Sequence, residues 1–225
     1  MSESRFIFET VDFQNGANTI NKYVDQYNAN CNAAVTGNTF KFASDYDRMK
    51  SLIGSKGQTR NSGYYDGLYV SLYNLTYTDG TTIPSINGPS GAGWGKQLWT
   101  GPITDYIALN DAYFQARTQK SDYIAVQIAG YLYSPVATTV TLQTTSDDGV
   151  AVYFNGSLAI NNWTYHGPTT DTSASLTVNA GYNPIRILYF EGAVTAQCDF
   201  VYKLPSSGAY TGNLKCNFFY NYNQM

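Results

Sequence analysis

The stretch IAVQIAGYLYSPVATTVTLQTTSDDGVAVYFNGSLAINNW, residues 124–163, decides the fold class of this chain. Its first part, together with Tyr123, is an apolar run rich in β-branched and aromatic side chains over 123–132, which predicts a strand. Pro135 closes that strand because proline lacks the N–H that a sheet needs. Residues 138–144 then alternate Val140 and Leu142 with Thr and Gln, as in a half-buried strand.

The same stretch ends in a hairpin signal. Residues 150–154 and 157–160 flank the pair Asn155–Gly156, which favours a type I′ turn because both central residues of that turn need positive φ. Outside the stretch, further strands are predicted over 68–73, 182–190 and 200–202. Short strands separated by turns predict an all-β protein with a β-sandwich fold.

The beginning of the chain has a different pattern. Residues 18–24 and 45–53 have weak helical spacing, and Gly54, Gly57 and Gly63 mark a break after them. We therefore expect residues 1–60 to form an N-terminal arm or cap of irregular and partly helical structure. Residues 61–225 form the expected sandwich.

Composition excludes several classes of function. The chain has 225 residues, a net charge of −3 and only 13% charged residues, so it offers no basic surface for nucleic acid. No stretch approaches the roughly 20 apolar residues that span a bilayer, which argues against membrane insertion. Residues 1–5 are not followed by the apolar run of a signal peptide. The 21 tyrosines suit half-buried strands and surfaces that bind polar ligands.

The cysteines are too few for a disulfide framework. Cys31, Cys198 and Cys216 form an odd set, so at most one disulfide forms within the chain. We expect the bond between Cys31 and Cys216, which would tie the two ends of the domain together, although the sequence does not decide among the pairings.

Ser146-Asp147-Asp148-Gly149 is the motif that carries chemistry. Neighbouring side chains of an extended strand point to opposite faces, so two adjacent carboxylates share one ion only if the backbone between them departs from that geometry. A cis peptide bond would place both on one side. Calcium, which takes about 6–8 oxygen ligands, fits such a pair best. The alternative is an ordinary turn, for which Asp-Asp-Gly is also suitable.

The order of motifs around this pair resembles the PA14 domain family. A strand ends in Gly-Tyr-Leu at residues 130–132, and a proline, a Thr/Val strand and Ser-Asp-Asp-Gly follow. An apolar strand, an Asn-Gly turn and Asn162-Trp163 come next, and residues 182–191 resemble the family's later strand. The resemblance covers about residues 64–204 and implies a PA14-like β-sandwich that binds carbohydrate.

In the lectin members of this family, an Asp-Asp pair joined by a cis peptide holds calcium. The resemblance implies that Asp147 and Asp148 are that pair. The remaining ligands would be Glu191 and the backbone carbonyls of Ala193 and Thr195, and a sugar would place two vicinal hydroxyls on the exposed ion. Glu191 departs from the family pattern, since the yeast adhesins have Asn there. Its carboxylate either strengthens calcium binding or points into the sheet.

Three residues after the hairpin are candidate sugar contacts: Trp163, Tyr165 and His166. Their aromatic rings could stack on the apolar face of a pyranose, although Trp163 also suits packing into the core. An enzyme is the weakest class of function. His166 is the only histidine, no Gly-x-Ser-x-Gly motif is present, and adjacent Asp residues do not by default straddle a glycosidic bond.

The sequence thus predicts a calcium-dependent lectin module of an adhesin at the extracellular cell surface or cell wall, with glycan termini as partners. One alternative is a non-catalytic structural module of a viral particle or coat, displayed on the virion surface. The other is an accessory domain of a glycosidase. Loss of sugar binding on chelation would favour the lectin, and indifference to chelator would favour the structural module.

Overall fold

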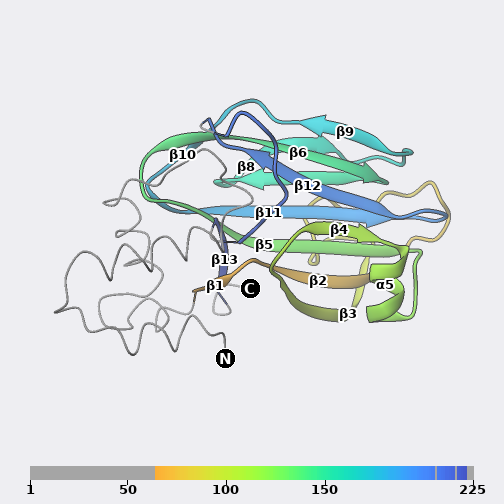
Figure 1. Cartoon of the computed structure of the whole chain (residues 1–225). Coiled ribbons are helices and arrows are strands. Elements are labelled where there is room, and N and C mark those ends of the chain that lie inside the picture. Colours follow the sequence, from red (N-terminus) through yellow and green to blue (C-terminus); the bar gives the residue numbers. More distant parts are fainter. Residues whose placement is uncertain (1–63, 206, 216, 222–225) are drawn as a thin grey trace, which may run out of the picture.

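The structure is a computed structural model that describes residues 64–205, 207–215 and 217–221. This part of the chain forms two antiparallel sheets that pack face to face, with one short helix (Figure 1). The predicted all-β sandwich is confirmed. The expected N-terminal arm and the expected partners Cys31 and Cys216 lie outside the described residues, within which Cys198 is a buried free thiol.

The larger sheet has eight strands in the order β1-β13-β5-β11-β7-β8, and β2 joins it by pairing with both β5 and β3. The bounds are β1 (Tyr64–Asp66), β2 (Leu68–Leu75), β3 (Trp94–Ile103), β5 (Ile124–Ser134), β7 (Val150–Phe154), β8 (Ser157–Asn162), β11 (Gly181–Glu191) and β13 (Phe218–Asn221). Its spine is the pair β5 and β11, which stay in register from Gly181 opposite Ser134 to Glu191 opposite Ile124.

The smaller sheet has five strands in the order β10-β6-β12-β4, with β9 paired to β6. Its bounds are β4 (Ile107–Asn110), β6 (Thr138–Asp147), β9 (Thr169–Thr172), β10 (Leu176–Val178) and β12 (Gln197–Lys203), and helix α5 (Asp111–Thr118) follows β4 directly. Among the described residues, none of the helical structure is long and apolar enough to cross a membrane.

The core between the sheets follows from period-two alternation. Every second residue of β5, β11 and β6 is buried, so Ile128, Ile187 and Leu142 belong to one apolar cluster. Burial of each such side chain stabilises the fold by about 1.5–3 kcal/mol. In Figure 1, β5 and β11 run through the middle of the molecule, with β6 and β12 on one side of them.

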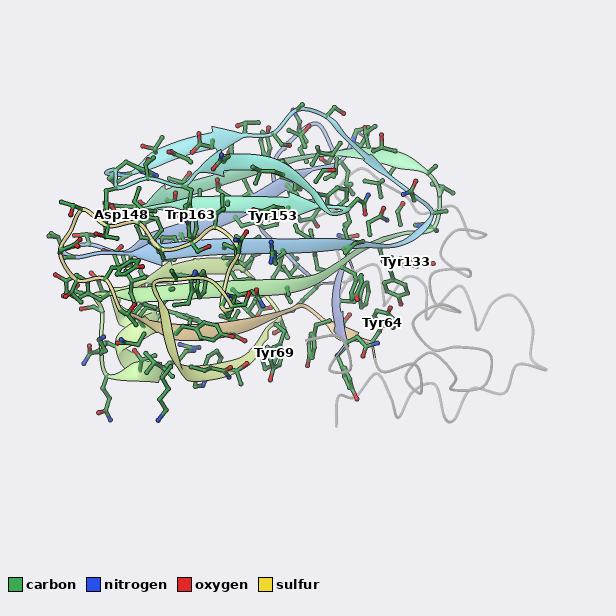
Figure 2. The ribbon with its side chains drawn as sticks, turned by 180° about the vertical axis from the view of Figure 1, so that it is seen from behind. Tyr64, Tyr69, Tyr133, Asp148, Tyr153 and Trp163 are labelled. Carbon is green, nitrogen blue, oxygen red and sulfur yellow. The ribbon has the colours of Figure 1, made fainter. Side chains whose placement is uncertain are left out.

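One end of the larger sheet is also buried on its outer face. A second apolar cluster lies there, formed by Leu75, Trp94, Ala125, Ala151, Leu188 and Phe190. The segment 76–93, here called the covering loop, is attached to it by two indole N–H groups. Trp94 donates to the Ser85 carbonyl at 2.8 Å and Trp163 donates to the Pro84 carbonyl at 2.7 Å. Figure 2 shows Trp163 near Asp148 at this end.

The predicted hairpin is confirmed. Asn155 and Gly156 have φ of 49° and 80° and connect β7 to β8, as a type I′ turn requires. Strand β3, which begins at Trp94, was not predicted from the sequence. Helix α5 was not predicted. Asn110 begins it by accepting the N–H of Tyr113 at 2.9 Å.

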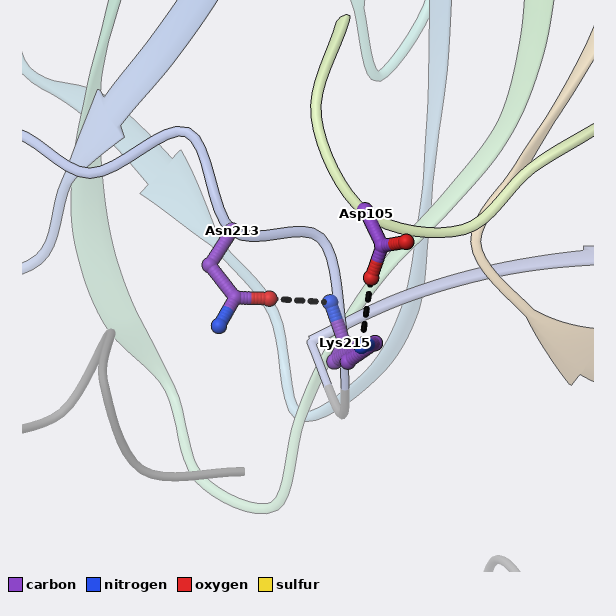
Figure 3. A network of polar contacts seen from close by, with 3 residues as sticks. All are labelled: Asp105, Asn213 and Lys215. Carbon is purple, nitrogen blue, oxygen red and sulfur yellow. Dashed lines mark hydrogen bonds and ion pairs between the residues drawn. The ribbon is translucent and has the colours of Figure 1, made fainter. Parts of the chain in front are cut away.

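The chain that leads into β13 is fixed by polar contacts with the turn before β4 (Figure 3). Lys215 forms an ion pair with Asp105, and its N–H donates to the side chain of Asn213 at 3.0 Å. The neighbouring Leu214 is buried and its N–H donates to the Asp105 carbonyl at 2.8 Å. The exposed ion pair contributes little on its own, so the buried leucine and the backbone bond are the main anchors.

Candidate functional site

Three carboxylates meet where β6 and β11 end on the same side of the sandwich. Asp147 is the last residue of β6, Asp148 follows it, and Glu191 is the last residue of β11. One oxygen from each lies within 4.8 Å of the others. The peptide bond between Asp147 and Asp148 is cis. Residues that the sequence separates by more than forty positions thus form one acidic cluster.

Asp148 links this cluster to two loops. Its Oδ1 accepts the backbone N–H of His166 at 3.0 Å, and its Oδ2 accepts the backbone N–H of Gly192 at 2.9 Å. The residue is only 7% exposed. Because charge-assisted bonds to backbone N–H groups stabilise a buried carboxylate, Asp148 fixes both loops around the cluster.

Glu191 lies on the inward face of β11, two residues after Tyr189, and both side chains are fully buried. The Tyr189 hydroxyl is 2.6 Å from the Asp147 carbonyl oxygen and 2.8 Å from Glu191 Oε2. Glu191 Oε1 has no hydrogen-bond partner. A buried polar atom without a partner costs about 1–3 kcal/mol, and among the described residues this oxygen is the one buried carboxylate oxygen of the cluster without a hydrogen bond.

The three carboxylates of the cluster repel one another when they are ionised. Burial raises the pKa of Glu191 from 4.5 to about 8, and the Asp148 and Asp147 carboxylates add to the effect against the hydrogen bond from Tyr189. Burial and the Asp148 carboxylate likewise raise the pKa of Asp147. A divalent cation would reverse these effects and supply the partner that Glu191 Oε1 lacks. The residues present therefore fit a hard cation.

The loop after β11 curves around the same cluster. Gly192 allows the close approach, because a Cβ there would lie 2.6 Å from the Tyr165 ring and 3.1 Å from Asp148 Oδ2. Val194 follows with φ of 89° and is 86% exposed. In the described part of the chain, no donor contacts the carbonyl oxygens of Ala193 or Thr195, so both remain available as ligands.

Comparison with known families finds a match to the part of the chain that contains the cluster. The PA14 domain family matches residues 104–211, which include all three carboxylates. These residues are a PA14 domain. No curated protein matches the chain in sequence.

Several solved structures share the fold of this chain. An anti-sigma factor domain-containing protein is 16% identical with a TM-score of 0.56 over 72% of this chain, which spans only 50% of that protein. The PA14 sugar-binding domain of an RTX adhesin is 18% identical with a TM-score of 0.55, over 69% of this chain and 98% of that one. The Epithelial Adhesin 9 A domain of Candida glabrata, solved with Galβ1-4GlcNAc, is 13% identical with a TM-score of 0.51, over 71% and 91%.

The three residues predicted to contact sugar have different surroundings in the PA14 domain. Trp163 packs edge-on against Phe190 with ring centroids 4.9 Å apart, and Tyr165 does the same at 5.2 Å while its hydroxyl donates to the Thr82 carbonyl at 3.3 Å. Both rings hold the covering loop. The half-buried His166 contacts Asp148 through its backbone, and its ring lies against the carbonyls of Gly167 and Asn162. Sugar contact by these residues stays a prediction.

Sequence reasoning missed two residues of the site. Tyr189 contacts both Glu191 and the Asp147 carbonyl, and Asp111 at the start of α5 accepts the N–H of Ala196 at 3.0 Å, which fixes the end of the loop. The position of Tyr189, two residues before Glu191, was a usable signal, because such residues share a face of a strand. Nothing local in the sequence pointed to Asp111.

Glu191 makes the stability of the ion-free domain depend on pH. Its folded-state pKa is raised to about 8, so its contribution to stability is full below the unfolded pKa and is lost as pH rises through the folded value. In EDTA we expect the free energy of unfolding to fall by about 1 kcal/mol per pH unit between about pH 6 and pH 7.5. Urea unfolding at a series of pH values measures this slope.

The matched control is Glu191→Gln, which keeps the shape of the side chain without a titrating group. The variant should show little of this slope over the same pH range. Equal slopes for both proteins would contradict the prediction.

Proposed function

We propose that this PA14 domain binds carbohydrate through a calcium ion held by Asp147, Asp148 and Glu191, with the carbonyl oxygens of Ala193 and Thr195. The observation that carries the proposal is Glu191 Oε1, a buried oxygen without a partner beside two further carboxylates. A bound cation satisfies that atom. The departure from the Asn of the yeast adhesins thereby gains a physical role, since it adds a third negative charge.

Calcium suits this set of ligands better than other common ions. The donors are all oxygen, which hard cations prefer, and calcium tolerates an irregular arrangement of about 6–8 of them. Magnesium demands near-ideal octahedral geometry and releases water reluctantly. The domain's three carboxylates and two carbonyls leave positions for ligands from outside the protein.

A sugar with two vicinal hydroxyls is a suitable external ligand. A rigid diol that chelates the ion loses less conformational freedom than two independent groups. The RTX adhesin domain is described as sugar-binding and the Epithelial Adhesin 9 domain was solved with a disaccharide, and the shared fold supports the same class of ligand here. We infer a non-catalytic module of an adhesin that binds glycan termini at the extracellular cell surface or cell wall.

The test combines calcium titration calorimetry with glycan-array binding in calcium and in EDTA. We expect one calcium ion per domain and sugar binding that EDTA abolishes and added calcium restores. Magnesium at the same concentration should not restore it. Strong sugar binding that is equal in calcium and EDTA would reject the ion-mediated mechanism, and calcium binding without any glycan ligand would reject the lectin.

A further inference from the structure

The outer face of the larger sheet carries two adjoining hollows beside the covering loop, which contacts Tyr153 and Arg186. One has a volume of about 360 Å³ and is walled by Tyr131, Tyr153 and Arg186. The other has about 280 Å³ and is walled by Tyr73, Gln97 and Gln127 among others. Ala129 lines both, so together they form one depression, here called the tyrosine trough.

The trough follows from the register of three strands. Ala129 on β5 points outward between Tyr69 on β2 and Arg186 on β11, its partners in the two neighbouring strands. A methyl group between two long side chains leaves a low floor with walls on both sides. Because the neighbours of Ala129 along β5 on the same face are Gln127 and Tyr131, the floor is bounded at each end as well.

The aromatic walls are held in place by their own contacts. The guanidinium of Arg186 lies 4.4 Å from the centre of the Tyr153 ring. Tyr73 meets Trp94 edge-on at 5.4 Å, and Tyr131 meets Tyr64 in the same way at 5.4 Å. The three tyrosines of the wall, Tyr73, Tyr131 and Tyr153, are half-buried, so each presents part of its side chain to solvent. Rigid aromatic groups of this kind bind at low cost in conformational entropy.

Apart from Arg186, the polar side chains that line the trough are uncharged. Within the described residues, no hydrogen bond occupies the carboxamides of Gln97 and Gln127. The hydroxyls of Ser71 and Thr100 lie 3.1 Å apart on neighbouring strands. None of the lining residues is acidic, and Arg186, whose guanidinium stacks on a tyrosine, is the only charged one.

We propose that the tyrosine trough is a second carbohydrate site, which binds an internal segment of a neutral oligosaccharide without calcium. Sugar rings have apolar C–H faces for the tyrosines and hydroxyls that match the carboxamides. The lining has no acidic residue and one cation, Arg186, whose guanidinium lies over the Tyr153 ring, which fits a neutral ligand. Each hollow is close to the roughly 300 Å³ at which small-ligand pockets begin. The proposal takes only its ligand class from the proposed function, and it needs neither Asp148 nor an ion.

The test uses neutral linear oligosaccharides, from di- to hexasaccharides of glucose, mannose and galactose, titrated into the whole chain in EDTA. We expect at least one series to bind, with affinity rising with length. Ala129→Tyr fills the floor and should weaken this binding about tenfold or more, as loss of a central contact does. Thr141→Tyr, at a half-buried outward position of the smaller sheet, is the matched control and should leave it unchanged.

A second variant avoids dependence on how Ala129→Tyr folds. Gln97 is exposed, so Gln97→Ala should keep the melting temperature and weaken binding several-fold. Failure of every oligosaccharide to bind in EDTA, unchanged affinity in both variants, or preference for a proline-rich peptide in the same panel would overturn the proposal. Loss of the calcium response with binding intact in EDTA would reject the proposed function alone.

Discussion

Asp148→Asn is expected to abolish the response of the domain to calcium. Without the mutation, calcium at about 100 times its dissociation constant should add about 2.7 kcal/mol to the free energy of unfolding. For a chain of this length, that corresponds to a rise in melting temperature of about 5–10 °C. The variant should show no such rise and no calcium-dependent sugar binding, because it removes one of the three charges that would hold the ion.

The readout has to be the difference between calcium and EDTA, because Asp148 also has a structural role. Its two oxygens accept N–H groups from His166 and Gly192, and an asparagine can satisfy only one of them, which costs about 1–3 kcal/mol in either buffer. The matched control is Asp199→Asn on β12, which is not one of the three clustered carboxylates. A calcium shift in Asp148→Asn equal to that of the unmodified domain would refute the assigned ligand.

Gly149→Ala should cost about 3 kcal/mol of stability, in calcium and in EDTA alike. A Cβ at this position would fall on the ring of Phe190, which is fully buried in the outer-face cluster. Overfilling a packed site commonly costs about 1–3 kcal/mol and occasionally more. Urea denaturation at constant pH measures the change.

Two controls separate the collision from other effects of adding a methyl group. Gly167→Ala lies in the nearby loop with no atom within 4 Å of the added Cβ, and such a change should stay within about 0.5 kcal/mol. Phe190→Leu in the Gly149→Ala background should recover part of the loss. Full additivity of the two single costs would show that the ring is not the obstacle.

The strands that the sequence predicted are those whose signals are local. β5, β6 and the β7–β8 hairpin have clear alternation or a diagnostic turn, and their bounds came within a few residues of the structure. β3 was missed because Gly95, Gly101 and Pro102 suggest a loop. It forms because β2 provides a partner for its backbone, and that information lies elsewhere in the chain.

Helix α5 escaped prediction for a different reason. It has only eight residues and one fully buried side chain, Phe114, so no apolar stripe repeats along it. Its main sequence signal is Asn110, which is common at helix starts and in turns alike. Short helices of this kind are defined by what they pack against.

The candidate site was predictable only in part, because its geometry also depends on contacts between residues that are distant in the sequence. The adjacency of Asp147 and Asp148 is visible in the sequence, and the resemblance to PA14 domains pointed to Glu191. That Glu191 points inward with one oxygen unsatisfied depends on the register of β11 and on the packing of Tyr189. The packing of Trp163 against Phe190 likewise depends on the covering loop. The sequence of that loop has turn residues but no signal that shows where it packs.

The two glycines that flank the acidic cluster carry a consequence for evolution. The ring of Phe190 occupies the space where a Cβ of residue 149 would lie, and the ring of Tyr165 does the same at residue 192. Each pair acts as a joint constraint, since a side chain at the glycine is tolerated only after its aromatic neighbour has shrunk. Among homologues, substitutions at 149 and 190, and at 192 and 165, should therefore arise together along the same lineages.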